Sequence, residues 1–92
     1  MIRTFRHKGL AGLWTKGTKK GLAADQVSRI ERLLDRLDAA ALPADMNVPG
    51  FGFHALKGKR KGEFAVTVTG NWRLTFYFDG DDAVDVDLVD YH

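Results

Sequence analysis

The sequence predicts an α+β fold in which two N-terminal helices pack on one face of a small antiparallel sheet. An apolar stripe with helical spacing lies in the first half of the chain, and segments of alternating apolar and polar residues fill the second half. A loop that contains both prolines, at about residues 43–52, separates the two halves. Helices followed by a run of short strands are typical of a two-layer α+β domain, and we expect residues 1–92 to form one such domain.

The first two elements are expected to be short. Residues 1–5 are predicted to form a strand with Ile2 turned inward. Residues 8–16 are predicted to form a helix, which Gly17 is well placed to end. Its apolar residues follow helical spacing: Leu10, Leu13 and Trp14.

A stronger helix is predicted over about residues 23–41. Its apolar positions form one continuous stripe: Val27, Ile30, Leu34, Leu37 and Ala41, widened by Leu33. Asp25 and Arg29 stand four residues apart in the favourable order for an ion pair.

The second half of the chain is predicted to be β structure. A short strand is expected at residues 51–56, followed by alternating segments at 63–69, 72–78 and 83–91. Gly70-Asn71 is a two-residue hairpin signal. Strict alternation in the last segment places three apolar residues on one face: Val84, Val86 and Leu88.

One conflict concerns the register of the hairpin. If Thr69 pairs with Trp72, strict alternation puts Val66 on the same face as Arg73 and on the face opposite Phe76. Either a bulge shifts the register, or the sheet is partly covered on both faces.

Charge is distributed unevenly along the chain. Residues 1–73 hold all 14 Lys and Arg against six acids, a balance of +8, whereas residues 74–92 hold six acids and no base, a balance of −6. This asymmetry indicates either a surface that faces a polyanion or solvated charge on the helices. The absence of cysteine fits a cytoplasmic protein, and no segment is long and apolar enough to span a bilayer.

The candidate reactive groups favour acid–base chemistry. There is no cysteine, the one serine (Ser28) lies within a predicted helix, and no two histidines have metal-ligand spacing, so nucleophilic acyl transfer and metal catalysis have little support. Imidazole can exchange protons near neutral pH, which directs attention to His54 and His92. A basic run lies beside His54: Lys57, Lys59, Arg60 and Lys61. With Arg73 as a bidentate phosphate ligand, these groups fit metal-independent ribonuclease chemistry, in which the 2′-OH of the RNA is the nucleophile.

Structural explanations stay open for the same residues. A histidine in a strand is more often a bystander than a catalyst, and a Lys/Arg/Gly run is usually a solvated loop. The closing Asp90-Tyr91-His92 is either a frayed end or part of a site at the end of a strand.

Several motifs together resemble a known family. They are Met1-Ile-Arg-Thr-Phe-Arg-His-Lys-Gly-Leu10, His54-Ala-Leu-Lys-Gly-Lys-Arg-Lys-Gly62, Gly70-Asn-Trp-Arg-Leu-Thr-Phe76 and the closing Asp-Tyr-His. This pattern closely resembles the HigB toxins of the RelE/ParE superfamily, from bacterial type II toxin–antitoxin modules, along essentially the whole chain.

The resemblance implies an activity and its partners. The expected activity is that of an endoribonuclease, or mRNA interferase, which inhibits translation by cutting mRNA in the decoding site of the 70S ribosome. The expected inhibitor is a helix-turn-helix antitoxin of the HigA type, and no cofactor is expected.

The resemblance also assigns residues. The family's functional positions fall on His54, Arg73, Asp90, Tyr91 and His92. The candidate nucleic-acid contacts are Lys57, Lys59, Arg60 and Lys61, with Lys16, Lys19 and Lys20 as further candidates. Two departures from the family pattern are Ala55, where proline is common, and Lys59, where an acid is common.

Two other functions remain open. A ParE-like protein would inhibit a protein target such as gyrase without catalysis, and an inactive module would only bind an antitoxin. Neither would need His54 or His92.

Overall fold

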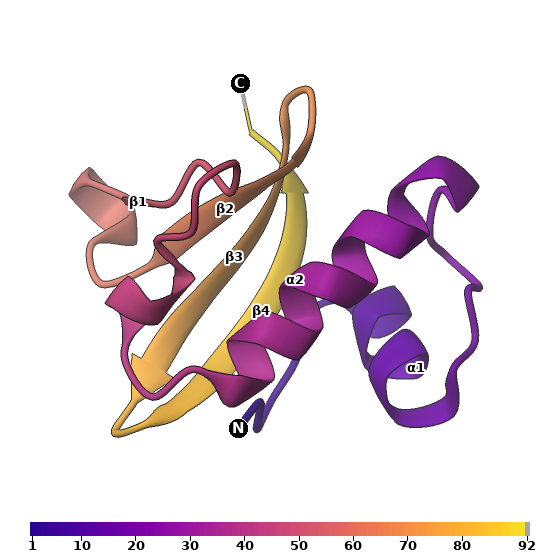
Figure 1. The fold of residues 1–92 in the computed structure, drawn as a ribbon, viewed down its shortest axis with the longest axis horizontal. Coiled ribbons are helices and arrows are strands. Elements are labelled where there is room, and N and C mark those ends of the chain that lie inside the picture. The colour runs from indigo at the N-terminus through magenta and orange to yellow at the C-terminus, as the bar shows by residue number, and fades with distance from the viewer. Residues whose placement is uncertain (92) are drawn as a thin grey trace.

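The computed structural model describes residues 1–91. Helices cover one face of a four-stranded antiparallel sheet with the strand order β1-β2-β3-β4 (Figure 1), so the predicted α+β layer is confirmed. In chain order the elements are α1 (Lys8–Lys16), a 3₁₀ turn η1 (Ala24–Gln26), α2 (Val27–Ala39), η2 (Pro43–Met46), β1 (His54–Ala55), η3 (Gly58–Arg60), β2 (Phe64–Thr69), β3 (Trp72–Asp79) and β4 (Asp82–Asp90). No helix in this part of the chain is long and apolar enough to cross a bilayer.

Helix α1 has the predicted bounds, and its ends have local causes. The Nδ1 atom of His7 accepts a hydrogen bond from the N–H of Leu10 at 3.2 Å, which satisfies one of the unpaired donors at the helix start. Gly17 adopts φ +71° and donates its N–H to the carbonyl of Leu13, which ends the helix. His7 therefore has a capping role.

Helix α2 is shorter than predicted, because residues 24–26 form a 3₁₀ turn and the backbone becomes extended at Ala40. Its apolar stripe is buried as far as Leu37: Val27, Ile30, Leu33, Leu34 and Leu37. The prediction for Ala41 was wrong, because the helix ends before it and the residue is exposed. The ion pairs found in residues 1–91 do not include Asp25 with Arg29. Arg29 Nη2 donates instead to the carbonyls of Thr67 and Gly50, and so ties α2 to β2.

The N-terminal segment runs beside the last strand. Instead of a continuous strand, Ile2 and Phe5 make two isolated parallel bridges with Ala83 and Val86 of β4. The N–H of Ile2 also donates to Asp38 Oδ1 at 2.9 Å, which ties the segment to α2.

This arrangement places bases beside much of the acidic half of the chain. Arg3 forms ion pairs with Asp79 and Asp82, and Arg6 lies 3.7 Å from Asp85. The hydrogen bond to Asp79 raises the pKa of Arg3. The charge asymmetry of the sequence is thus partly neutralised at this edge, away from the basic run at residues 57–61.

A bulge resolves the register conflict in the β2–β3 hairpin. Thr69 pairs with Trp72 and Thr67 pairs with Arg73, so Val68 is the extra residue. Beyond the bulge, Val66 lies opposite Leu74 and therefore shares the face of the apolar residues of β3.

Because of a second bulge, the two faces of β4 differ from those predicted. Asp85 has φ +52°, and the β3–β4 register shifts between Thr75 and Tyr77. Val84 pairs with Tyr77 and so lies on the face opposite Val86. The prediction for Val84 was wrong, because Ala83 takes the core position and the bulge restores Val86 and Leu88 to the same side.

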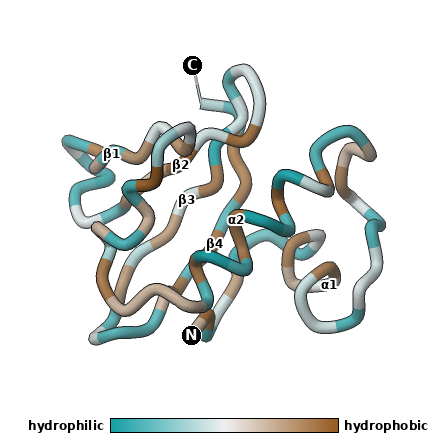
Figure 2. Tube along the Cα trace, viewed as in Figure 1, coloured by the Kyte–Doolittle hydropathy of each residue, from teal (hydrophilic) through white to brown (hydrophobic). Residues whose placement is uncertain are grey.

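The core lies between the sheet and the helices. Apolar residues from α1 and α2 pack against those of one sheet face: Val66, Val68, Leu74, Phe76, Ala83, Val86 and Leu88. Figure 2 shows hydrophobic and hydrophilic residues recurring along α2, as its stripe requires. The opposite face of the sheet is called here the helix-free face. It holds the residues that alternate with the core residues along the strands: His54, Glu63, Ala65, Thr67, Arg73, Thr75, Tyr77, Val84, Asp87 and Val89.

Candidate active site

Two cross-strand rows place the candidate residues on the helix-free face. One row runs through His54, Ala65, Thr75 and Asp87 on four successive strands. The neighbouring row contains Arg73, between Thr67 and Val89. Paired residues share a face of the sheet, so His54 and Arg73 point to the same side.

His54 is exposed, and its ring is oriented by the preceding loop. Its Nδ1 atom lies 3.0 Å from the carbonyl oxygen of Gly52. Because a carbonyl only accepts, Nδ1 carries the proton in this contact, and the lone pair of a neutral ring is then on Nε2. The loop therefore presents Nε2 of His54 as a potential base.

The loop that holds His54 depends on a glycine. Gly52 has φ +62°, and a Cβ atom at this position would lie 2.6 Å from Thr67 Oγ1. The loop approaches β2 this closely because the N–H of Thr67 donates to the carbonyl of Phe51 at 2.7 Å.

We therefore expect Gly52→Ala to lower the free energy of unfolding. The matched control is Gly50→Ala, since Gly50 has φ +88° but no atom within 4 Å of the place that an added methyl group would take. Both substitutions carry left-handed strain of roughly 1–2 kcal/mol, and the steric clash should add about 1–3 kcal/mol for Gly52 alone. Urea denaturation would measure the difference, and equal losses would contradict a role for close packing.

Arg73 is held by the hairpin that precedes it. Its Nη1 donates to the carbonyls of Gly70 and Trp72, at 2.7 and 3.2 Å. Its Nε is buried and has no hydrogen-bond partner in residues 1–91. The guanidinium is thus anchored at one nitrogen and keeps donors for a further acceptor.

The closing residues extend β4 along the hairpin. Asp90 pairs with Trp72, and the N–H of Tyr91 donates to the carbonyl of Asn71 at 2.8 Å, so residues up to Tyr91 are not a frayed end. By alternation Asp90 and Trp72 belong to the opposite face from Arg73, whereas Tyr91 belongs to the same face as Arg73. His92 lies outside the described residues.

The basic run is not uniform. Lys57, Lys59 and Lys61 are exposed, whereas Arg60 Nε donates to the buried carboxylate of Glu63 at 2.7 Å. The guanidinium carbon of Arg60 also lies 5.7 Å from the centre of the Tyr91 ring. Three lysines are therefore available to a polyanion, and the arginine is engaged within the fold.

The other three candidate lysines lie elsewhere. Lys16 ends α1, and Lys19 and Lys20 follow it in an exposed loop. Helix α1 and β1 lie toward opposite ends of the long axis of the molecule (Figure 1). The structure does not bring these lysines together with His54 and Arg73.

Three buried polar atoms lie at the site, and two of them belong to residues that the sequence analysis missed, Glu63 and Thr75. Glu63 Oε2, Arg73 Nε and Thr75 Oγ1 are buried without a partner in residues 1–91. Glu63 is 1 % exposed and Thr75 is fully buried. All three side chains belong to the helix-free face, and unpaired buried polar groups are uncommon away from functional sites. The sequence analysis missed Thr75 because strict alternation, read without the bulge, gives this residue the wrong cross-strand neighbour.

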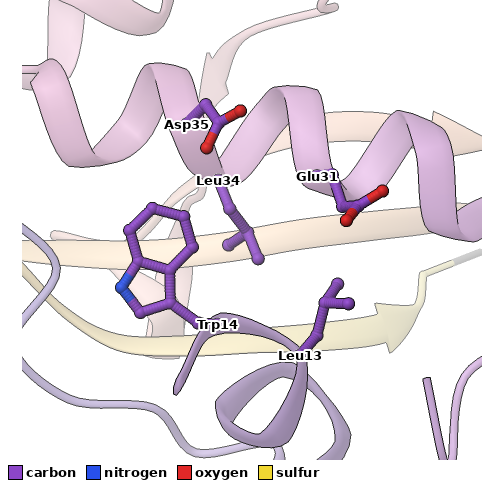
Figure 3. A pocket seen from close by; sticks show the side chains of 5 residues that line it. All are labelled: Leu13, Trp14, Glu31, Leu34 and Asp35. Carbon is purple, nitrogen blue, oxygen red and sulfur yellow. The ribbon is translucent and has the colours of Figure 1, made fainter. Parts of the chain in front are cut away.

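The described residues show no metal site at these side chains. No group of three or more His, Asp or Glu residues within 1–91 is placed to hold a metal ion. A cavity of about 90 Å³ lies between α1 and α2 (Figure 3), lined by Leu13, Trp14, Glu31, Leu34 and Asp35. None of the residues that line this cavity is a candidate site residue.

Comparisons with known proteins agree on the fold and the family. A family model described as "RelE-like toxin of type II toxin-antitoxin system HigB" matches residues 3–92. The protein named Endoribonuclease HigB from Proteus vulgaris is 41% identical over 92 residues, which are 100% of both chains. A crystal structure of a mutant of YafQ from E. coli superposes with a TM-score of 0.56 at 17% identity, covering 95% of this chain and 89% of that chain.

The fold and the matched motifs define the class as a RelE-like toxin of a type II toxin–antitoxin system. Within this class, the chain belongs to the HigB-like toxin family. The predicted family and fold are thus confirmed, and the predicted endoribonuclease agrees with the name of the Proteus relative. A toxin of this type acts together with an antitoxin partner.

Proposed function

We propose that this toxin is a cytoplasmic endoribonuclease that cleaves mRNA in the decoding site of the 70S ribosome, under the control of a HigA-like helix-turn-helix antitoxin. One observation carries the proposal. His54, whose Nδ1 contacts the carbonyl of Gly52, shares the helix-free face with Arg73, and the loop that bears Lys57, Lys59 and Lys61 directly follows its strand. A base and a phosphate ligand beside a cationic loop are the groups that RNA cleavage through the 2′-OH requires.

The proposed reaction is a transesterification. A base removes the proton of the 2′-OH, and the oxygen attacks the adjacent phosphorus. The bond to the 5′-oxygen breaks, and an acid protonates this leaving group. The products are a 2′,3′-cyclic phosphate and a 5′-hydroxyl. The candidates for the base and the acid are His54, which lies on the helix-free face, and Asp90 and His92 at the end of the chain. Alternation in β4 turns Asp90 toward the opposite face, so in this proposal the end of β4 must present Asp90 around the edge of the sheet.

The positions of His54 and Arg73 support this reaction. Arg73 is on β3 and His54 on β1, so two strand spacings of about 4.8 Å separate their strands. Two side chains that reach toward each other over this span can flank one phosphodiester. In the proposed role, Arg73 and Lys57 stabilise the negative charge that develops on the phosphorane.

Cleavage on purified translating ribosomes tests the function. We expect the mRNA to be cut in the decoding site and to end in a 2′,3′-cyclic phosphate, while DNA gyrase keeps its supercoiling activity. Growth arrest with intact mRNA and inhibited gyrase would support the ParE-like alternative instead.

The exposed lysines of the loop should contribute to association by charge. Lys59→Glu with Lys61→Glu should weaken ribosome binding by roughly tenfold or more near 0.1 M salt and make the dependence of affinity on salt shallower, because fewer counterions are released. Lys16→Glu with Lys19→Glu changes the net charge equally and is the control, for which we expect a smaller loss. Binding measured over a range of salt concentrations would decide, and equal losses would contradict a local contact.

A further inference from the structure

The contact between Arg60 and Tyr91 joins two distant parts of the chain. Arg60 is in the loop after β1, at one end of the strand order, and Tyr91 follows β4, at the other end. Its guanidinium carbon lies 5.7 Å from the ring centre, a distance at which a cation is attracted to an aromatic face. The contact therefore crosses the helix-free face.

Arg60 is itself held by a buried carboxylate. Its Nε donates to Glu63 Oε1 at 2.7 Å, and the Glu63 side chain is 1 % exposed. A buried carboxylate is costly unless it is paired, so this ion pair differs from the solvated pairs of Arg3 and Arg6. The hydrogen bond to Glu63 raises the pKa of Arg60, and Tyr77 and Tyr91 also contribute.

These contacts limit what Arg60 can do for RNA. Its side chain is 33% exposed, against 48% and 53% for Arg3 and Arg6, and its Nε is occupied. The exposed lysines on either side of it are better placed to meet a phosphate. Arg60 is better placed to hold the Tyr91 ring, whose backbone N–H donates to the carbonyl of Asn71.

We propose that Arg60, anchored by Glu63, is a positioning residue that fixes the ring of Tyr91 over the helix-free face. The inference rests on the proposed function, in which Tyr91 belongs to the active surface. A ring fixed in advance stacks on a nucleobase without the entropy cost of ordering it on binding.

Nuclear magnetic resonance tests the contact without any assay of activity. We expect the Nε–H proton of Arg60 to exchange slowly with solvent and the side chain to show a ring-current shift. Tyr91→Leu should abolish the ring-current shift, and Tyr91→Phe should retain it, because the ring face is kept. An Arg60 side-chain spectrum that is unchanged by Tyr91→Leu would overturn the proposal.

Single-turnover cleavage tests the consequence. Arg60→Ala alone would leave a buried charge unpaired and could unfold the protein, so the variant is Arg60→Ala with Glu63→Gln. The control is Arg6→Ala with Asp85→Asn, which removes the same two charges from an exposed pair. We expect the first variant to lose about 10- to 100-fold in maximal rate, the size of a positioning defect, and the control to match the parent.

The dependence on ribosome and salt concentration separates positioning from phosphate binding. The Arg60 variant should keep the parent's half-saturating ribosome concentration and the parent's dependence of binding on salt. Lys59→Ala should raise the half-saturating ribosome concentration and make the dependence of binding on salt shallower. An Arg60 variant that behaves like Lys59→Ala would overturn the proposal. A parent that cleaves no RNA would refute the proposed function, and the resonance measurement would still decide the contact.

Discussion

Replacing His54 by alanine should lower mRNA cleavage on translating ribosomes by about 10²–10⁴, the usual loss when one general acid or base is removed. The fold should survive, because His54 is exposed and its side-chain bond is to the neighbouring carbonyl of Gly52. Single-turnover kinetics would measure the rate, and circular dichroism with antitoxin binding would verify the fold.

A second histidine offers a matched control for this prediction. His7→Asn removes an imidazole but keeps a side-chain acceptor for the N–H of Leu10 at the start of α1. We expect it to leave cleavage at the parental rate. A His54→Ala variant that cleaves as fast as His7→Asn would remove His54 from the site.

Deleting residues 90–92 should reduce cleavage to background while the protein stays folded. The segment contains Tyr91, which carries the contact to Arg60, and two of the three groups proposed as base or acid. Val86 and Leu88 still anchor β4 in the core. The deletion removes the pairing of Asp90 with Trp72 and the backbone bond from Tyr91 to Asn71. The melting temperature should therefore fall by about 4–8 °C, the effect of roughly 1 kcal/mol in a domain of this size.

Stepwise deletion separates the contributions of the three residues. Removing position 92 alone tests His92, removing 91–92 adds the loss of the ring, and removing 90–92 adds the loss of the carboxylate. Near-parental cleavage by the shortest protein, measured on translating ribosomes, would show that this segment is dispensable.

The sequence alone determined the features that depend on neighbouring residues. The spacing of Val27, Ile30 and Leu34 was enough to predict α2, because burial of one stripe follows from 3.6 residues per turn. Gly17 and Gly70-Asn71 marked a helix end and a hairpin, since both depend on local backbone preferences. The family was recognised from contiguous motifs in the same way, and its match along residues 3–92 confirmed it.

The tertiary structure decided the features that depend on distant partners. The extra residues at Val68 and Asp85 set which side chains share a face, and neither position carries a local signal strong enough to reveal a bulge. Alternation read without these bulges misplaced Val84 and hid the row that joins His54 to Thr75.

The same reason applies to the charges of the candidate site. In the sequence Arg60 is one of four bases in a run, and nothing nearby distinguishes it from Lys59. Only the fold buries Glu63 beside it and brings Tyr91 from the last strand to its guanidinium. A local pattern states which residues prefer water or the core, whereas the partner of a side chain depends on which distant strands pair and in what register.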